Sequence, residues 1–255
     1  MKRNGEAMEE LIAVMERLLA PDGCPWDREQ THESLVRYLI EETYEVIEAI
    51  EKKDMQLLQE ELGDLLLQVV FHAALAEREG AFDFADVASG VSGKMIARHP
   101  HVFGDMNLKS SDDVMEVWES FKKKEGKKHL LDGIPKGMPA LMRAEKVQEK
   151  ASRVGFDWPD AEGALEKFKE EVDELVQAES GPQLEEEMGD VLFALVNIAR
   201  LKNIEPEQAL QHSSDKFIRR FEYIESQLQQ QGKSWGQSDL QEMDALWDEA
   251  KKKGL

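Results

Sequence analysis

The acidic residues of this chain form two motifs that occur twice, in the same order. Each half carries Glu-Glu-x-x-Glu followed by Glu-Glu-x-Gly-Asp. Residues three apart on a helix share one face, so the second and fifth residues of each motif present two carboxylates in one direction. Two such helices side by side would gather four carboxylates, and oxygen ligands are what Mg²⁺ or Mn²⁺ prefers. The candidate metal ligands are Glu42, Glu45, Glu61 and Asp64 in the first half and Glu171, Glu174, Glu187 and Asp190 in the second.

A single acidic motif carries little information, because 53 of the 255 residues are Asp or Glu. At that composition about two copies of Glu-Glu-x-x-Asp/Glu arise by chance, and most such runs are solvated helix faces. The flanking residues also match, however. They align Glu61-Leu-Gly-Asp64-Leu-Leu-Leu with Glu187-Met-Gly-Asp190-Val-Leu-Phe, Lys94-Met-Ile-Ala-Arg98 with Lys216-Phe-Ile-Arg-Arg220, and Trp118 with Trp247. Ordered matches of this kind indicate an internal duplication.

Length and composition suit two domains of about 125 residues, each large enough to bury its own core. A segment rich in Gly, Pro and Lys separates the two halves. We therefore predict an N-terminal repeat over 1–126, a linker over 127–138 and a C-terminal repeat over 139–255.

Helical periodicity runs through almost the whole sequence and strand signals are nearly absent, which predicts an all-α fold. The expected helices span 6–20, 32–52, 55–79, 83–98 and 111–124 in the first repeat, and 139–151, 161–179, 182–202, 205–231 and 239–253 in the second. Apolar residues in 65–76 and 191–201 cover more than one helix face. We expect this excess to be buried in a homodimer that completes domains of the four-helix-bundle type.

The two repeats differ in the cations available to a phosphate ligand. Lys216, Arg219 and Arg220 follow the acidic motifs of the second repeat, and Arg can bind phosphate bidentately. The first repeat has Lys94 and Arg98, with Ala97 in the place of Arg219. The second repeat is therefore predicted to perform most of any catalysis. Glu170, which points away from its neighbour Glu171, either orients water or a second metal ion or is simply solvated.

Composition also excludes several classes of protein. A net charge of −21 argues against binding a nucleic-acid polymer, which needs a basic face. No run approaches the roughly 20 apolar residues of a membrane span, and the N-terminus lacks the apolar core of a signal peptide. The one cysteine, Cys24, excludes an intrachain disulfide and fits a reducing cytoplasm.

The combination of both acidic motifs with a downstream Lys-x-x-x-Arg resembles the all-α nucleoside triphosphate pyrophosphohydrolases. The tandem form is similar to the MazG family through Cys24-Pro-Trp-Asp27, His99-Pro-His-Val-Phe103, Pro139-Ala-Leu-Met-Arg143 and Val154-Gly-Phe-Asp-Trp158. The resemblance implies Mg²⁺-dependent hydrolysis of an NTP to NMP and pyrophosphate, with broad base tolerance, by a homodimer. It implies catalytic roles for Glu170, Glu171, Glu174, Glu187 and Asp190, and nucleotide contacts for Lys216, Phe217, Ile218, Arg219, Arg220 and Trp247.

Three other interpretations compete with this one. A di-iron carboxylate bundle requires Glu-x-x-His pairs, whereas the corresponding position here is always Glu or Asp. A narrower enzyme of the same fold, such as a dUTP or phosphoribosyl-ATP pyrophosphatase, stays open. So does a non-enzymatic helical protein that binds a regulatory partner.

Overall fold

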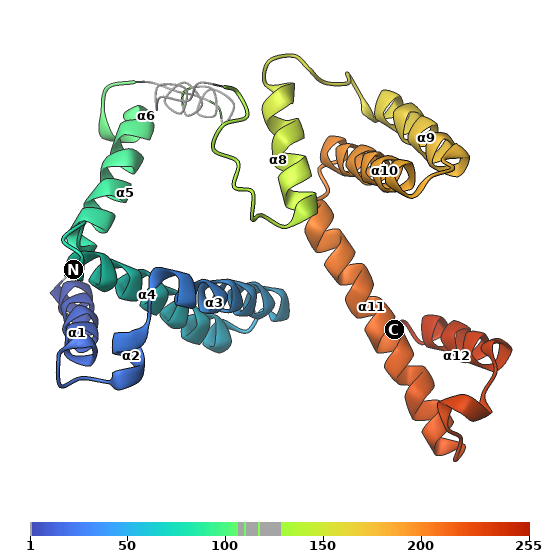
Figure 1. Cartoon of the computed structure of the whole chain (residues 1–255), viewed down its shortest axis with the longest axis horizontal. Helices are drawn as coiled ribbons and strands as arrows, with labels where there is room; N and C mark the ends of the chain where they lie inside the picture. The colour runs from blue at the N-terminus through green and yellow to red at the C-terminus, as the bar shows by residue number, and fades with distance from the viewer. Residues whose placement is uncertain (1, 107–109, 111–116, 118–128) are drawn as a thin grey trace. The chain divides into compact units, whose positions relative to one another are not determined.

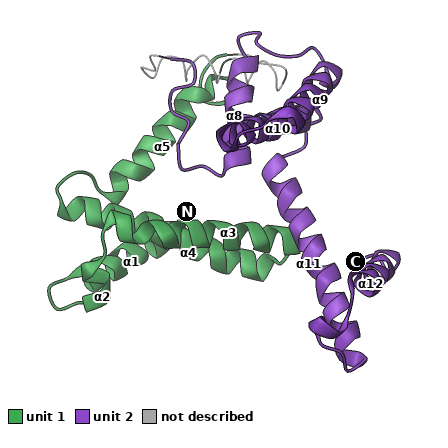
Figure 2. Ribbon diagram, turned by 45° about the vertical axis from the view of Figure 1, so that its right-hand side comes forward, with its two compact units in different colours: residues 1–124 green, residues 125–255 purple. Residues whose placement is uncertain are grey.

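The computed structural model describes residues 2–106, 110, 117 and 129–255. Over these residues every regular element is helical, as the periodicity predicts. The chain divides into two compact units, unit 1 over residues 1–124 and unit 2 over residues 125–255 (Figure 2). The helix expected over 111–124, with Trp118, lies outside the described residues. Within them, no helix is long and apolar enough to cross a membrane.

Unit 1 is built on a pair of packed helices that carry the first two acidic motifs. Its helices are α1 (Lys2–Leu19), α2 (Pro25–Glu29), α3 (His32–Lys52), α4 (Met55–Arg78), α5 (Phe84–Arg98) and α6 (Pro100–Phe103) (Figure 1). Side-chain caps fix the starts of the pair, since Thr31 accepts from the Ser34 amide and Asp54 from the amides of Gln56 and Leu57. Lys53, in the left-handed region with φ 56°, closes the connection between α3 and α4.

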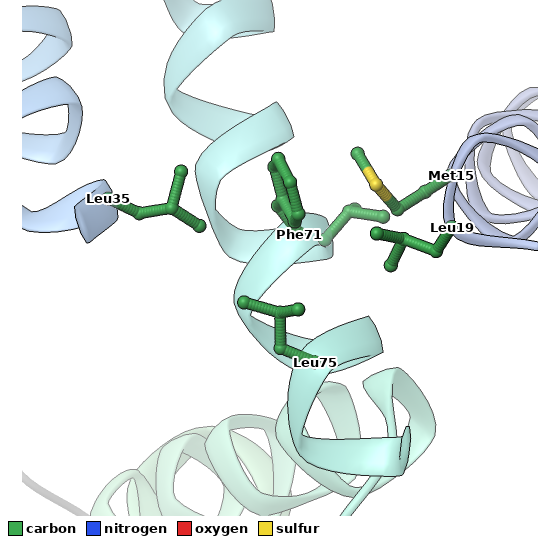
Figure 3. Packing of buried hydrophobic residues seen from close by; sticks show 6 residues of the cluster. Met15, Leu19, Leu35, Phe71 and Leu75 are labelled. Atoms are coloured by element: carbon green, nitrogen blue, oxygen red, sulfur yellow. The ribbon is translucent and has the colours of Figure 1, made fainter. Parts of the chain in front are cut away.

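The core of unit 1 joins three helices around one aromatic side chain. Phe71 of α4 lies between Leu35 of α3 and the α1 residues Met15 and Leu19 (Figure 3). Phe71 is only 4% exposed and Leu35 1%. Burying large apolar side chains of this kind stabilises each by roughly 1.5–3 kcal/mol relative to exposure. The α3–α4 pair is thereby closed on one side by α1.

Unit 2 repeats this order of helices. Its elements are α8 (Ala140–Ser152), α9 (Ala161–Gln177), α10 (Gly181–Leu201), α11 (Pro206–Gln230), the 3₁₀ turn η1 (Trp235–Gln237) and α12 (Leu240–Lys252) (Figure 1). Helices α9 and α10 form the motif-bearing pair, and α8 packs against α10 as α1 packs against α4. Helices α11 and α12 form a second pair around buried Ile224, Leu228 and Leu246.

The nine expected helices that fall on described residues are present, with ends within four residues of the predicted ones. The short elements α2, α6 and η1 were missed because three to five residues give no periodicity. Pro25 and Pro100 at first helical positions were the available signal for α2 and α6.

Candidate metal centre and adjoining cavity

The acidic motifs of unit 1 converge between α3 and α4. Carboxylate oxygens of Glu42, Glu45 and Glu61 all lie within 4.8 Å of one another. Asp64, the fourth predicted ligand, is outside that group but close enough for its charge to act on Glu42. Burial, followed by the charges of Asp64, Glu45 and Glu61, raises the pKa of Glu42 to about 6.

The motifs of unit 2 converge in the same way between α9 and α10. Here the carboxylate oxygens of Glu171, Glu187 and Asp190 lie within 4.8 Å of one another. Glu171 is the most enclosed of them, at 7% exposed. Glu174 is the fourth predicted ligand and is outside the group, although burial and the charge of Glu171 raise its pKa.

Both groups fit a small divalent cation by their chemistry. Every donor is a carboxylate oxygen, and Mg²⁺ binds such oxygens at about 2.1 Å, so two ligands of one ion lie at most about 4.2 Å apart. The oxygens of each group lie within 4.8 Å of one another, so a closure of at most about 0.6 Å (4.8 − 4.2) meets that limit. Burial, followed by the charges of neighbouring acids, raises the pKa of Glu42, and a bound cation would offset the cost of keeping that carboxylate ionised.

A lysine distinguishes the acid group of unit 2. Lys167, one turn before Glu171 on α9, places Nζ 2.7 Å from Glu171 Oε1 and 2.9 Å from Glu170 Oε1. Those two bonds raise the pKa of Lys167, so it is a permanent positive charge beside the carboxylates. The aligned residue in unit 1, one turn before Glu42, is Tyr38. Sequence reasoning overlooked Lys167, although its spacing of four residues from Glu171 was the signal.

A cavity of about 750 Å³ adjoins the acid group of unit 2. It lies between α8, α9 and α10, and both Glu171 and Asp190 form part of its wall. Most of its surface is apolar, and its aromatic members are Phe156 and Trp158 from the α8–α9 connection and Phe193 from α10. The volume falls in the range of small-molecule sites, about 300–1,000 Å³. Sequence reasoning did not anticipate this cavity.

A polar chain runs along one wall of the cavity. Arg200 binds Asp157 with both terminal nitrogens, one of them at 3.0 Å, and also donates to Asn197 Oδ1 at 2.8 and 3.1 Å. On α8, the Gln148 amide nitrogen donates to the Phe193 carbonyl oxygen at 2.8 Å. These bonds hold two side-chain amides at the cavity in defined orientations.

The predicted nucleotide-binding residues lie on a different helix pair within unit 2. Phe217 and Arg220 of α11 pack on Trp247 of α12, at 5.0 Å between ring centroids and 5.4 Å from the guanidinium carbon to the ring. Arg220 Nε also donates to the Leu255 oxygen at 2.7 Å. Lys216, Ile218 and Arg219 are exposed on α11. The contacts described for Arg220 and Trp247 therefore join α11 to α12 and the chain's last residue, and their role at a nucleotide stays a prediction.

Fold and site together define an all-α protein with two carboxylate centres suited to a divalent cation. The model of the MazG nucleotide pyrophosphohydrolase domain matches residues 30–103 and 161–224, one segment in each unit. The chain belongs to the MazG nucleotide pyrophosphohydrolase family.

Full-length relatives agree with this assignment. The chain is 47% identical over 254 residues to the nucleoside triphosphate pyrophosphohydrolase/pyrophosphatase MazG of Thermotoga maritima, covering 98% of each sequence. It is 43% identical over 258 residues to the nucleoside triphosphate pyrophosphohydrolase of Escherichia coli K12, covering 97% of this chain and 98% of that one.

A crystal structure of a MazG-related protein from Thermotoga maritima, 34% identical, matches 46% of this chain and 99% of that chain with a TM-score of 0.40.

Proposed function

We propose that this chain hydrolyses nucleoside and deoxynucleoside triphosphates to the monophosphate and pyrophosphate, using Mg²⁺, with Mn²⁺ as an alternative ion. One observation carries the proposal. The carboxylates of Glu171, Glu187 and Asp190 lie within 4.8 Å of one another at the edge of a cavity large enough for a nucleotide. The full-length similarity to proteins named for this activity supports the same reaction.

In unit 2 the metal-holding residues are Glu171, Glu187 and Asp190, with Glu174 joining them when the site closes. Bound Mg²⁺ would offset the negative charge of carboxylates and phosphates and lower the pKa of a coordinated water. Glu174 has two carboxylate oxygens, and the one that does not contact the metal would accept the proton of the attacking water. Water attacks the α-phosphorus, and pyrophosphate leaves.

Cations of the chain neutralise the rest of the triphosphate. Lys167 already lies against Glu171 and Glu170, so it can exchange these partners for a phosphate oxygen. Lys216, Arg219 and Arg220 supply the remaining phosphate contacts. Trp247, packed on Phe217 and Arg220, holds the face of α11 that carries them. Water enters from solvent and no redox step is needed.

We also propose that the chain is a homodimer whose subunits complete four-helix bundles. The motif-bearing helices expose large apolar side chains that a monomer leaves in water, namely Leu62, Val69, Met188, Leu192 and Leu195, each between 38% and 48% exposed. Sedimentation at micromolar concentration should give twice the 29.1 kDa chain mass. A mass near that of one chain would contradict the dimer.

The test of the activity is a panel of NTPs and dNTPs with and without Mg²⁺, in which pyrophosphate and phosphate are measured separately. We expect pyrophosphate from several bases, only with metal. Turnover of one base alone would favour a narrower enzyme of the same fold. No turnover with any triphosphate would favour a non-enzymatic regulatory protein.

A further inference from the structure

The cavity of unit 2 occupies the place that unit 1 fills with core side chains. The acidic motifs align the two units, so residues at equal distance from them correspond. Ala164, seven residues before Glu171, corresponds to Leu35, seven before Glu42. Asn197, seven residues after Asp190, corresponds to Phe71. Leu35 and Phe71 are core residues of unit 1, whereas Ala164 and Asn197 line the cavity.

A third aligned pair also has a larger side chain in unit 1 than in unit 2. Ala194 lines the cavity in unit 2, where unit 1 has the buried Gln68. Three larger side chains at one place have thus become Ala, Ala and Asn. An unfilled apolar space of this kind lowers stability. Room for a ligand is a functional reason to keep it.

Two amide groups give this space a hydrogen-bonding pattern. The Arg200 guanidinium donates two hydrogen bonds to Asn197 Oδ1. This fixes the orientation of the Asn197 amide and leaves its NH₂ group as a donor for a ligand. Within the described residues, that NH₂ group has no hydrogen-bond partner. Gln148 is 7% exposed, its nitrogen is bound to Phe193, and its Oε1 is buried without a partner in the described part of the chain. A buried acceptor without a partner costs about 1–3 kcal/mol unless a ligand or water satisfies it.

We propose that this cavity binds the nucleobase of the triphosphate, and that the Asn197 NH₂ group donates to purine N3 or pyrimidine O2. This rests on the proposed function, because the triphosphate must lie at the carboxylates. Asn197 is two helical turns beyond Asp190, about 10 Å along α10, which leaves the ribose between base and metal centre. Purine N3 and pyrimidine O2 are acceptors that all the common bases share at their minor-groove edge. A hydrogen-bond donor directed at this atom can bind any of the common bases. This accounts for broad base tolerance.

Trp158 is one of the aromatic residues that line the cavity, and its position depends on a glycine. A Cβ at Gly163 would lie 2.6 Å from a ring carbon of Trp158, so only glycine lets the ring pack on the first turn of α9. An indole face beside an apolar space is a surface on which a base can stack, for about 1–3 kcal/mol per base. Trp158 thus supplies a contact that does not discriminate among bases.

The first experiment fills the cavity with the residue that unit 1 uses. Ala164→Leu should raise KM for every NTP by at least about 10-fold, because a side chain replaces ligand volume. Its melting temperature should stay equal or rise, since Leu fills an empty apolar space. Ala209→Leu, at an exposed position of α11, is the matched control and should leave KM unchanged. An unchanged KM in a well-folded Ala164→Leu protein would overturn the cavity assignment.

The second experiment tests the hydrogen bond from the ligand side. 3-Deaza-ATP lacks the N3 acceptor, whereas 7-deaza-ATP keeps it. Wild type should lose about 5- to 30-fold in kcat/KM with 3-deaza-ATP relative to 7-deaza-ATP. Asn197→Leu should lower kcat/KM for ATP and 7-deaza-ATP and abolish the difference between the analogues.

The outcomes separate this proposal from the proposed activity. If no triphosphate is hydrolysed by wild type, the proposed function itself fails. If ATP is hydrolysed but 3-deaza-ATP and 7-deaza-ATP react equally, the base contact at Asn197 is wrong. A difference between the analogues that persists in Asn197→Leu would place the donor on another residue.

Discussion

The two carboxylate centres share their geometry and differ in what surrounds them. In each unit, three carboxylates from two packed helices lie within 4.8 Å. In unit 1, Tyr38 stands one turn before Glu42, and Phe71 fills the space between α3, α4 and α1. In unit 2, Lys167 pairs with Glu171 and a cavity adjoins the acids.

This difference indicates that the acidic motif by itself is suited to a cation and does not make a catalytic site. A triphosphate also needs room for its nucleoside and positive charges for its phosphates. Unit 2 offers both at one place, whereas the aligned place in unit 1 is core. Unit 1 is therefore expected to contribute metal binding and stability, and unit 2 catalysis.

The largest expected effect comes from removing single acids. Glu171→Ala or Asp190→Ala should lower NTP hydrolysis by more than about 100-fold, because metal-bound charge stabilisation supplies several kcal/mol of the barrier reduction. Glu42→Ala and Asp64→Ala are the matched changes in unit 1 and should keep a large part of the activity. Circular dichroism checks that all four proteins fold. Inactive unit 1 variants beside active unit 2 variants would reverse the assignment.

Truncating a core side chain of unit 1 should lower stability and leave turnover almost unchanged. Phe71→Ala removes the ring that joins three helices of unit 1 and should lower the free energy of unfolding by about 3–5 kcal/mol. Urea denaturation followed by circular dichroism measures this loss. Below the melting transition, turnover should remain near wild type. A matching loss of kcat at temperatures where the protein is folded would argue that unit 1 shapes the catalytic site.

Divalent cations should stabilise the folded chain. A cation that binds only the folded state adds about 2.7 kcal/mol at 100 times its Kd. Thermal melts in EDTA and in millimolar Mg²⁺ should therefore differ for wild type. Removing one acid from each unit, as in Glu42→Ala with Glu171→Ala, should abolish the shift, and identical wild-type melts would contradict both metal centres.

The smallest effect is a pH dependence in unit 1 without metal. Burial and neighbouring acids raise the pKa of Glu42 from 4.5 to about 6 in the folded protein. The folded state thus holds this proton more tightly than the unfolded state, and the stability it contributes is complete below pH 4.5 and lost as pH rises through 6. In EDTA, the melting temperature should fall more between pH 4.5 and pH 6.5 for wild type than for Glu42→Gln. Parallel curves for the two proteins would contradict the raised pKa.

The sequence pattern was sufficient to predict the long helices and to predict that the acidic side chains of each repeat lie close together. The period of 3.6 residues places α3, α4, α9 and α10, and a spacing of three places two carboxylates on one face. Pattern could not show that Asp64 and Glu174 would lie outside the closest group, because side-chain reach depends on how the helices pack.

The cavity could not be predicted from the sequence pattern, for a different physical reason. It arises from what is missing at aligned positions, Ala164 for Leu35 and Asn197 for Phe71, and each substitution alone is an ordinary one. Only the fold shows that both face the same space. A comparison of residue sizes between the two repeats, position by position, was the signal that could have found it.

If unit 2 alone is catalytic, one nucleotide binds per chain, in unit 2. Calorimetric titration with an α,β-methylene triphosphate analogue, which cannot release pyrophosphate, measures this directly in the presence of Mg²⁺. We expect one nucleotide per chain for wild type and for Glu42→Ala, and none for Glu171→Ala. Two nucleotides per wild-type chain, or binding that survives Glu171→Ala and disappears in Glu42→Ala, would contradict it.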